Sequence, residues 1–261
     1  MTAKRSLVMT ITLTALACAP LIAQSASPAV RVSYATSAMV EIVSPGGVRV
    51  LIDVYKPNLL SSPATDKDIL LTTHGHDDHY DYAFLQSFKG RQLRIEAGSI
   101  EQGDVKITGI PSAHNNDYLS GEKNGTNYLV LVETGGLRIA HMGDIGQTKL
   151  TDSQMATLGR IDVMITQFDN DYSRMSVENG KGFALVAQAD PALIIPTHNS
   201  DAALKRQAKE YSCVSSPGAF VSLESGKLRA ARLAAGKSLL LIIGPDLESR
   251  AGLCGAKPID W

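Results

Sequence analysis

The sequence lacks a strong excess of either charge, since its 261 residues include 25 Lys and Arg against 26 Asp and Glu. A near-neutral chain has no broad field that attracts polyanions, which disfavours nucleic acid as a partner. Internal repeats and low-complexity tracts are also lacking. What is present is a hydrophobic fraction of 44% with 20% charged residues, which is typical of a globular chain rather than a disordered or fibrous one. The length fits one large domain or two small ones.

The N-terminal segment contains a short apolar run. Two basic residues at positions 4 and 5 precede Leu7–Ala19, which is apolar apart from threonines, and small residues follow at Ala23–Ala26. This layout is typical of a secretory signal peptide. A membrane span needs about 20 apolar residues, and Pro20 ends the run early. We predict a signal peptide at 1–26, a domain at 27–261 and an exported protein, periplasmic or secreted, without a stable membrane span. An uncleaved anchor is the alternative.

Cysteines are scarce, with three in the whole chain. The segment Ala15–Cys18 loosely resembles a lipoprotein cleavage site, so lipidation is a second processing route. Either cleavage leaves Cys213 and Cys254 in the domain, with 23 basic and 26 acidic residues if the cut follows Ser25 or Ala26. An oxidising compartment permits the two cysteines to pair, and two buried free thiols are the alternative.

Strand patterns outnumber helix patterns along the domain. Hairpins are predicted through Pro45–Gly47 and through Gly135–Gly136, where glycines allow a tight turn. The predicted strands cover residues 32–44, 48–54, 69–73, 105–110, 127–133, 137–141, 161–168, 192–195 and 237–243, and the predicted helices cover 80–88 and 177–188. Because hairpins lead and helices follow, we expect an α/β fold in which sheets pack on each other with helices outside.

Three of the six histidines fall within the run His74-Gly75-His76-Asp77-Asp78-His79. Alternate residues of an extended segment point the same way, so His74 and His76 can face one point. Asp78 and His79 lie where the chain turns into a helix and can face a second point nearby. A solvated polar loop without a metal is the alternative, but this spacing of ligand types favours a metal site.

Three further candidate ligands each follow a predicted strand: His114, Asp144 and His198. Their alternatives are ordinary loop histidines and a turn aspartate beside Gly143 and Gly146. Imidazole and carboxylate suit zinc, and manganese or iron is also possible. Two divalent metal ions that share a water lower its pKa toward neutrality, and the bridging hydroxide can attack a carbonyl carbon or a phosphorus atom.

The run resembles the HxHxDH signature of the metallo-β-lactamase superfamily, and the later elements follow in that superfamily's order. The branch that it resembles most includes ascorbate-6-phosphate lactonase and N-acyl phosphatidylethanolamine phospholipase D. The resemblance implies a four-layer αββα sandwich. It assigns His74, His76 and His114 to one metal and Asp78, His79 and His198 to the other, with Asp144 as the bridge. It also implies that Asp78 holds or relays the proton of the attacking water, as the catalytic residue.

The resemblance implies hydrolysis of an ester, lactone or phosphodiester in a small molecule or lipid. A nuclease of the same superfamily and a non-catalytic metal-binding protein are the alternatives; the charge balance and the lack of a basic domain weigh against the first. We do not predict antibiotic hydrolysis. The sequence departs from the family in segments such as Gln167–Tyr172, where the family is usually glycine-rich, and these departures leave the substrate open. The sequence carries no signal for the oligomeric state.

Other polar residues near the motif have weaker assignments. His141 precedes Asp144 with no ligand role left, so we expect it to hold a neighbour by a hydrogen bond. Asp53 is expected either to support a ligand or to occupy a turn at a strand end. The residues Asn116, Asp169 and Tyr172 either line the pocket or lie on surface loops.

Overall fold

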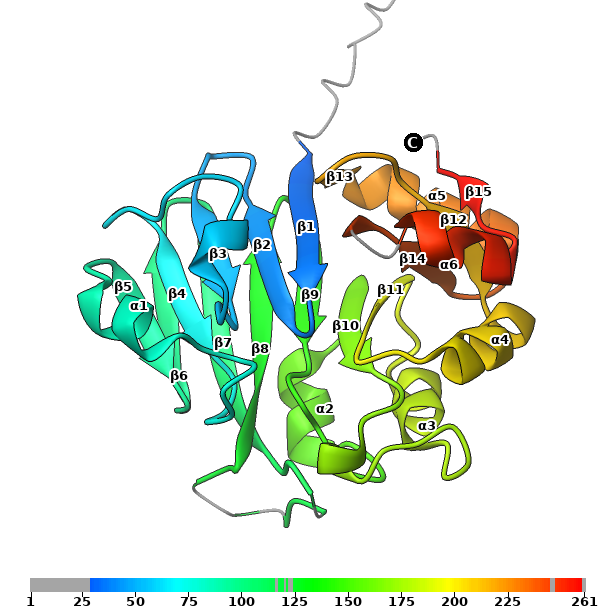
Figure 1. Ribbon diagram of the computed structural model, residues 1–261, viewed down its shortest axis with the longest axis horizontal. Coiled ribbons are helices and arrows are strands. Elements are labelled where there is room, and N and C mark those ends of the chain that lie inside the picture. The colour runs from blue at the N-terminus through cyan, green and yellow to red at the C-terminus, as the bar shows by residue number, and fades with distance from the viewer. Residues whose placement is uncertain (1–28, 116, 120, 122–123, 245–246, 260–261) are drawn as a thin grey trace, which may run out of the picture.

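Two β-sheets form the centre of the molecule in the computed structural model, which describes residues 29–115, 117–119, 121, 124–244 and 247–259 (Figure 1). The predicted signal segment 1–26 and Asn116 lie outside the described residues. The first sheet has the strand order β13-β1-β2-β3-β4-β5, and the second has the order β15-β12-β14-β11-β10-β9-β8-β7-β6. The first sheet contains β1 (Val30–Thr36), β2 (Met39–Val43), β3 (Arg49–Ile52), β4 (Ile69–Thr72), β5 (Arg91–Arg94) and β13 (Val221–Leu223).

The second sheet continues the chain after β5 and receives most of the later strands. Its members are β6 (Gly98–Gln102), β7 (Val105–Ser112), β8 (Asn127–Thr134), β9 (Leu137–His141), β10 (Val163–Gln167), β11 (Leu193–Thr197), β12 (Ser212–Ser215), β14 (Leu239–Ile242) and β15 (Lys257–Pro258). The helices are α1 (Tyr82–Ser87), α2 (Asp152–Leu158), α3 (Lys181–Ala189), α4 (Asp201–Glu210), α5 (Ser225–Ala235) and α6 (Leu247–Cys254), with short 3₁₀ turns η1 (Pro57–Leu59) and η2 (Asp171–Ser173).

The main core lies between the two sheets. Alternate strand residues point to the same face, so β-branched side chains such as Ile42 of β2 and Ile165 of β10 meet in one buried cluster. A second cluster packs α2, α3, α4 and α6 on the outer face of the larger sheet, and a third packs α1 on the smaller sheet. Figure 1 shows α1 on the left of the view and α3, α4 and α6 on the right, with strands between them. The predicted αββα arrangement is confirmed.

The prediction of one continuous strand over residues 32–44 was wrong. The chain turns at Ser37, whose φ is 48°, so this segment forms the antiparallel pair β1 and β2. No glycine or proline marks the turn, which is why the sequence pattern did not reveal it. The hairpin of β8 and β9 through Gly135 and Gly136 is confirmed, with positive φ at both glycines. The strands β5, β6, β12, β13 and β15 and the helices α2, α4, α5 and α6 were not predicted.

The two domain cysteines are free thiols in this structure. Cys213 lies on β12 and Cys254 ends α6, and both pack against the same outer cluster. Burial, and then the contact with the Cys254 thiol, raise the pKa of the Cys213 thiol. A raised pKa lowers the thiolate fraction, so Cys213 is a poor nucleophile at neutral pH.

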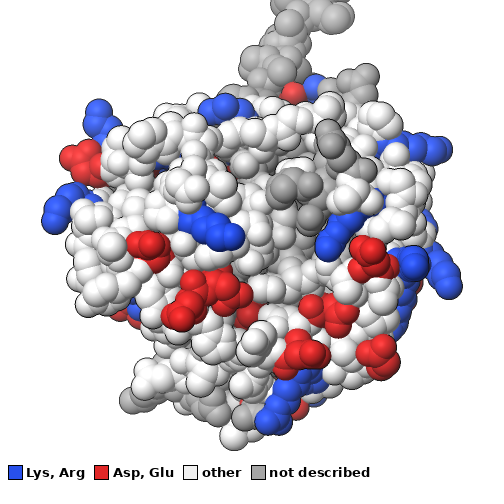
Figure 2. All heavy atoms as spheres, viewed as in Figure 1, with Lys and Arg blue, Asp and Glu red and all other residues white. Residues whose placement is uncertain are grey.

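Acidic and basic side chains lie intermixed on the one face of the molecule that Figure 2 draws. On the face drawn in Figure 2, Lys and Arg side chains are scattered among Asp and Glu, and no continuous basic band crosses it. In the part of the chain that the structure describes, no helix has both the length and the apolar character that a membrane crossing requires.

A buried ion cluster joins the smaller sheet to the loop that precedes β4. Arg49 contacts the Asp68 carboxylate at 2.6 Å and that of Glu41 at 3.4 Å, and it also donates to the carbonyl oxygen of Pro63. Replacing Arg49 with alanine leaves two buried carboxylates without their cation. We expect Arg49→Ala to lower the free energy of unfolding by about 3–5 kcal/mol in denaturant titrations.

The matched control is Arg160→Ala, which removes an ion pair whose arginine side chain is 60% exposed. The Asp162 carboxylate is 1% exposed, but it keeps the Arg229 side chain and the Arg138 backbone N–H as partners, so this variant should unfold close to the wild type. Equal midpoints for Arg49→Ala and the wild type would contradict a stabilising role for the buried cluster.

Candidate metal centre

The candidate ligands meet at one edge of the two sheets, where four strands end. The run from His74 to His79 follows β4, and His114 follows β7. Asp144 follows β9, and His198 follows β11. Strand-end loops on a rigid scaffold commonly carry functional side chains, because the strands fix where each loop begins. All seven predicted ligands therefore lie in one region, although they come from distant parts of the sequence.

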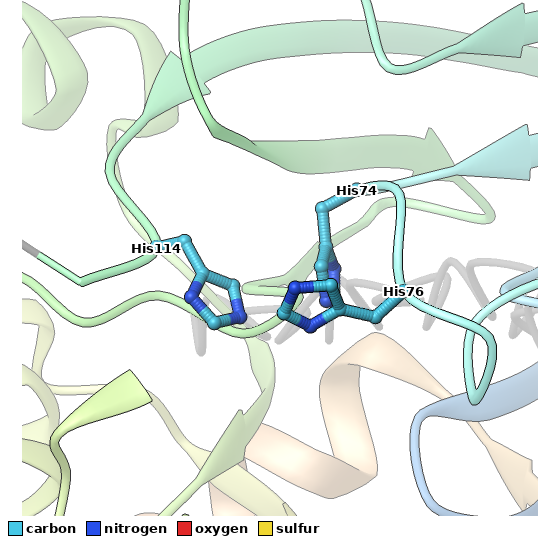
Figure 3. Close-up of side chains that lie close together, drawn as sticks. All are labelled: His74, His76 and His114. Carbon is cyan, nitrogen blue, oxygen red and sulfur yellow. The ribbon is translucent and has the colours of Figure 1, made fainter. Parts of the chain in front are cut away.

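Three histidines form a first group. Figure 3 shows the rings of His74, His76 and His114 turned toward one another, the first two from the segment after β4 and the third from the segment after β7. Their ring centroids lie 4.6–4.8 Å apart. One nitrogen from each ring lies within 4.8 Å of the other two, which is the spacing of side chains that can share one ion. His74 and His114 are buried and His76 is exposed, so solvent reaches this group from one side.

A second group consists of Asp78, His79 and His198, whose ligand atoms also lie within 4.8 Å of one another. The Asp78 Oδ2 atom lies 3.9 Å from the Nε2 atoms of both His79 and His198. The His79 side chain is fully buried, whereas that of Asp78 is 46% exposed. Asp78 therefore sits at the open side of this group, where it can meet both an ion and a solvent molecule.

Asp144 lies between the two groups, and its two carboxylate oxygens face different histidines. Its Oδ1 atom is 3.3 Å from His79 Nε2 and 3.2 Å from His198 Nε2. Its Oδ2 atom is 3.8 Å from His74 Nε2 and 3.7 Å from His114 Nε2. One carboxylate thus offers one oxygen to each group, which is the arrangement of a bridging ligand.

Several buried polar atoms of the cluster have no hydrogen-bond partner among the described residues. They are the Nε2 atoms of His74, His79, His114 and His198, together with Asp144 Oδ1. An unsatisfied buried polar group costs about 1–3 kcal/mol, so five converging ones need an explanation. Imidazole nitrogens and a carboxylate oxygen are the donors that first-row divalent cations take. The residues present therefore fit the metal ions that the sequence motif predicts.

The opposite ring nitrogens of three histidines are held by hydrogen bonds that leave Nε2 free. His79 Nδ1 donates to Asp53 Oδ2 at 2.8 Å. The Thr73 hydroxyl donates to the same carboxylate at 2.7 Å, so its oxygen accepts from His74 Nδ1 at 3.1 Å. His114 Nδ1 lies 2.9 Å from the side-chain oxygen of Asn115. Partners of this kind fix the tautomer and the ring orientation of metal-binding histidines.

The electrostatics of the cluster favour a cation. Burial, and then the charge of His79, lower the pKa of His74 to about 3. Burial opposes protonation of His79, but the charge of Asp53 and the contacts with Asp144 outweigh it and raise the pKa to about 10. Burial likewise opposes ionisation of Asp144, yet its contacts with His114 and His198 hold its pKa well below the usual range. The buried carboxylates of Asp53 and Asp144 favour positive charge at this place, which a divalent cation would supply.

Hydrogen bonds and local backbone geometry also hold the main chain around the cluster. Asn127 accepts the Asp144 backbone N–H at 2.9 Å and donates to the Met142 carbonyl at 2.9 Å. Gly143 has a φ of 54°, and a Cβ atom there would lie 2.3 Å from Asn127 Oδ1. His198 has a φ of 37°, which is unusual for a non-glycine residue and is typical of functional sites.

The supporting residues named from sequence have distinct places. His141 Nε2 donates to the Ala38 carbonyl at 2.8 Å, and its Nδ1 accepts from the Gly143 N–H at 3.1 Å, so it holds a neighbour as expected. Asp53 supports His79 directly rather than merely occupying a turn. Asp169 is half-buried and its backbone N–H donates to the His198 carbonyl, whereas Tyr172 is 81% exposed.

An open pocket of about 340 Å³ gives access to the first group. Its lining residues are His74, Gly75, His76, His114, Asn115 and Thr126. None of these residues is lysine or arginine, so any anion that enters would rely on bound cations for charge. The pocket size suits a small molecule or one end of a larger one.

Sequence patterns did not reveal three polar residues that contact the cluster. Thr73 connects His74 to Asp53, Asn127 holds the backbone of Asp144, and Asn170 donates to Asp144 Oδ2 at 2.7 Å. Thr73 is adjacent to the motif and could have been considered there. Asn127 and Asn170 lie 17 and 26 residues from Asp144, with nothing in the local sequence that indicates contact.

Comparison with known proteins agrees with the sequence resemblance. The profile of the β-lactamase superfamily domain matches residues 31–198. A UPF0173 metal-dependent hydrolase from Rubrobacter xylanophilus is 26% identical over 44% of this chain and 60% of its own length. One from Methanopyrus kandleri is 27% identical over 58% of this chain and 76% of its own length. The chain thus spans less than two thirds of the first relative, and the names of both agree with the class predicted from sequence.

The fold agrees as well. A solved structure from Thermotoga maritima, assigned to the metallo-β-lactamase superfamily, superposes with a TM-score of 0.56 at 18% identity, over 81% of this chain and 97% of its own. The profile match covers every one of the seven candidate ligands, from His74 to His198. The branch that contains the lactonase and the phospholipase stays a prediction. The chain belongs to the β-lactamase superfamily.

Proposed function

We propose that the protein is a metal-dependent hydrolase with a dinuclear site. His74, His76 and His114 hold one cation, and Asp78, His79 and His198 hold the other. Asp144 bridges the two. The observation that carries this proposal is the division of the Asp144 carboxylate, which presents one oxygen to the histidines of each group at 3.2–3.8 Å.

Two bound divalent cations would supply Lewis acidity and lower the pKa of water held between them. The chain's own residues do the rest. The imidazoles and the Asp144 carboxylate would hold the two cations, and Asp53 and Thr73 hold His79 and His74 in the orientation that frees Nε2. Asp78 is the half-exposed carboxylate at the opening and accepts the proton of the attacking water. Zinc fits this donor set, and manganese and iron fit it too.

The proposed substrate is a small molecule or lipid that contains an ester, lactone or phosphodiester. Its reacting end must enter a pocket of about 340 Å³ that has no basic side chain in its lining. A nuclease would need a basic track for the phosphate backbone, and the face drawn in Figure 2 has none. The small-molecule or lipid hydrolase therefore has more support than the nuclease. Export of the protein through removal of residues 1–26 is part of the same proposal.

The first experiment measures metal content and hydrolysis together. The purified protein is analysed by elemental mass spectrometry, before and after chelation, beside His76→Ala. It is then assayed on aryl esters, simple lactones and an aryl phosphodiester. We expect about two equivalents of metal per chain, a lower content in His76→Ala, and hydrolysis that is lost on chelation and restored by zinc or manganese. The intact mass also shows whether residues 1–26 have been removed.

The proposal fails if the protein binds no metal even after reconstitution, since the ligands would then not act together. It also fails if hydrolysis persists unchanged in fully chelated protein, because the reaction would then proceed without the cluster.

A further inference from the structure

Asn170 occupies a rigid turn just beyond the end of β10. Its backbone N–H donates to the Met175 carbonyl at 2.8 Å, and the Met175 N–H donates back at 3.0 Å, which closes the turn over residues 170–175. The side chain of Asn170 is buried with the residue at 7% exposure. The turn therefore holds the Asn170 side-chain amide at a fixed position in the interior.

The orientation of that amide is determined by its neighbours. The backbone N–H of Tyr172 can only donate, so the atom that it contacts at 3.1 Å is Asn170 Oδ1. Asn170 Nδ2 is then the donor to two acceptors, Gln167 Oε1 and Asp144 Oδ2, each at 2.7 Å. Gln167 is oriented in turn, because its Nε2 donates to the Ile145 carbonyl at 2.7 Å. This chain of hydrogen bonds leaves one arrangement for the amide.

The contact with Asp144 has a mechanical consequence. The last torsion of an aspartate side chain has only a broad preference of its own, so the carboxylate plane is set by its partners. The Asp144 backbone is already held through Asn127. The Asn170 N–H is the hydrogen-bond donor that fixes Oδ2, and fixing Oδ2 also aims Oδ1 at His79 and His198, where Oδ1 has no hydrogen-bond donor among the described residues.

We propose that Asn170 is a positioning residue that sets the rotation of the Asp144 carboxylate and thereby holds its two oxygens toward separate cations. This role rests on the proposed dinuclear function and extends it to a residue that touches neither cation. Without the Asn170 donor, the carboxylate can rotate and turn both oxygens toward one group. The second cation would then lose a ligand although all seven ligand side chains are still present.

The test compares Asn170→Ala, Asn170→Asp and Asn179→Ala with the wild type, all as full-length protein. Asn170→Ala removes the donor. Asn170→Asp keeps the shape and the acceptor for the Tyr172 N–H, but it replaces the donor with an oxygen facing Asp144 Oδ2. Asn179→Ala is the control, because the Asn179 amide holds the same turn through the Arg174 carbonyl at 2.9 Å and contacts no candidate ligand.

Four readouts distinguish positioning from a loss of fold: circular dichroism, titration with Mn²⁺, the electron spin coupling between two bound Mn²⁺ ions, and steady-state kinetics of hydrolysis. We expect Asn170→Ala and Asn170→Asp to retain the wild-type spectrum and to bind the second Mn²⁺ about 10–100-fold more weakly, the loss typical for a partner of a metal ligand. Spin coupling should decrease in both variants, and kcat should fall by more than KM rises. Asn179→Ala should behave like the wild type.

The possible results distinguish a failure of the dinuclear function from a failure of the positioning role of Asn170. Wild-type protein that fails to bind two Mn²⁺ ions would overturn the dinuclear function and this role with it. Wild-type protein that binds two coupled ions, beside folded Asn170→Ala and Asn170→Asp variants that bind both ions within about twofold of wild type, would overturn the role of Asn170 alone.

Discussion

Asp144→Ala is expected to remove the site's capacity for both cations and to abolish turnover. One carboxylate serves both groups, so its loss takes a ligand and a negative charge from each. Metal affinity should fall by more than the roughly 10–100-fold that is lost when a hydrogen-bond partner of a metal ligand is removed. Elemental analysis should show less than about one equivalent of metal, against about two in the wild type.

Thermal unfolding provides an independent measurement of the same change. A cation at about 100 times its dissociation constant stabilises a protein that binds it by about 2.7 kcal/mol. Zinc should therefore raise the Tm of the wild type and leave that of Asp144→Ala unchanged.

His141→Ala is the matched control for a buried side chain beside the cluster. Both of its ring nitrogens are occupied by backbone groups of Ala38 and Gly143, so neither can reach a cation. We expect this variant to keep its metal content and to lose only part of its activity. If Asp144→Ala kept two equivalents of metal, the bridging assignment would have to be abandoned.

Asp78→Ala is the second substitution with a large expected effect. Asp78 is the only carboxylate proposed for the second group besides the shared Asp144, and it is also the proposed proton acceptor. General-base catalysis contributes about 10²–10⁴-fold, so kcat should fall by at least that range. The Asp78 side chain is 46% exposed, so the substitution should leave the folded structure intact.

The neighbouring Asp77 offers a close control. Asp77 is exposed, carries the same charge in the same loop and belongs to neither of the two ligand groups. Steady-state kinetics of Asp77→Ala should match those of the wild type within about twofold, because exposed charges have small effects. Full activity of Asp78→Ala would contradict the proposed proton transfer.

The arrangement of the strands explains how distant residues form one site. The parallel pairs β3–β4, β9–β10 and β10–β11 end at the same edge, so the loops that follow them lie together. The side chains of His79, Asp144 and His198 are thereby brought within 3.2–3.9 Å of their partners. The sheets determine where these side chains lie, because His114, Asp144 and His198 follow the last residues of β7, β9 and β11 by only two, three and one positions.

The local sequence determined which residue types could bind a metal and roughly where. The run from His74 to His79 predicts part of its own geometry. Side chains alternate in direction along an extended segment, so His74 and His76 point to the same side. The position of His114 and His198 after apolar strands also predicted a location at strand ends. The β8–β9 hairpin before Asp144 followed from Gly135 and Gly136, whose backbone adopts the positive φ of a tight turn.

The tertiary structure alone decided how these groups face one another. Asn127 at the start of β8 holds the Asp144 backbone, and Asn170 in the turn after β10 donates to Asp144 Oδ2; neither residue has a sequence relation to the motif. The turn at Ser37 and the short strands β5, β6, β12 and β13 depend on pairing with neighbours rather than on local preference. A local pattern specifies the direction and chemistry of a side chain, whereas the rotation of a buried carboxylate is set by hydrogen bonds that exist only after the sheets have packed.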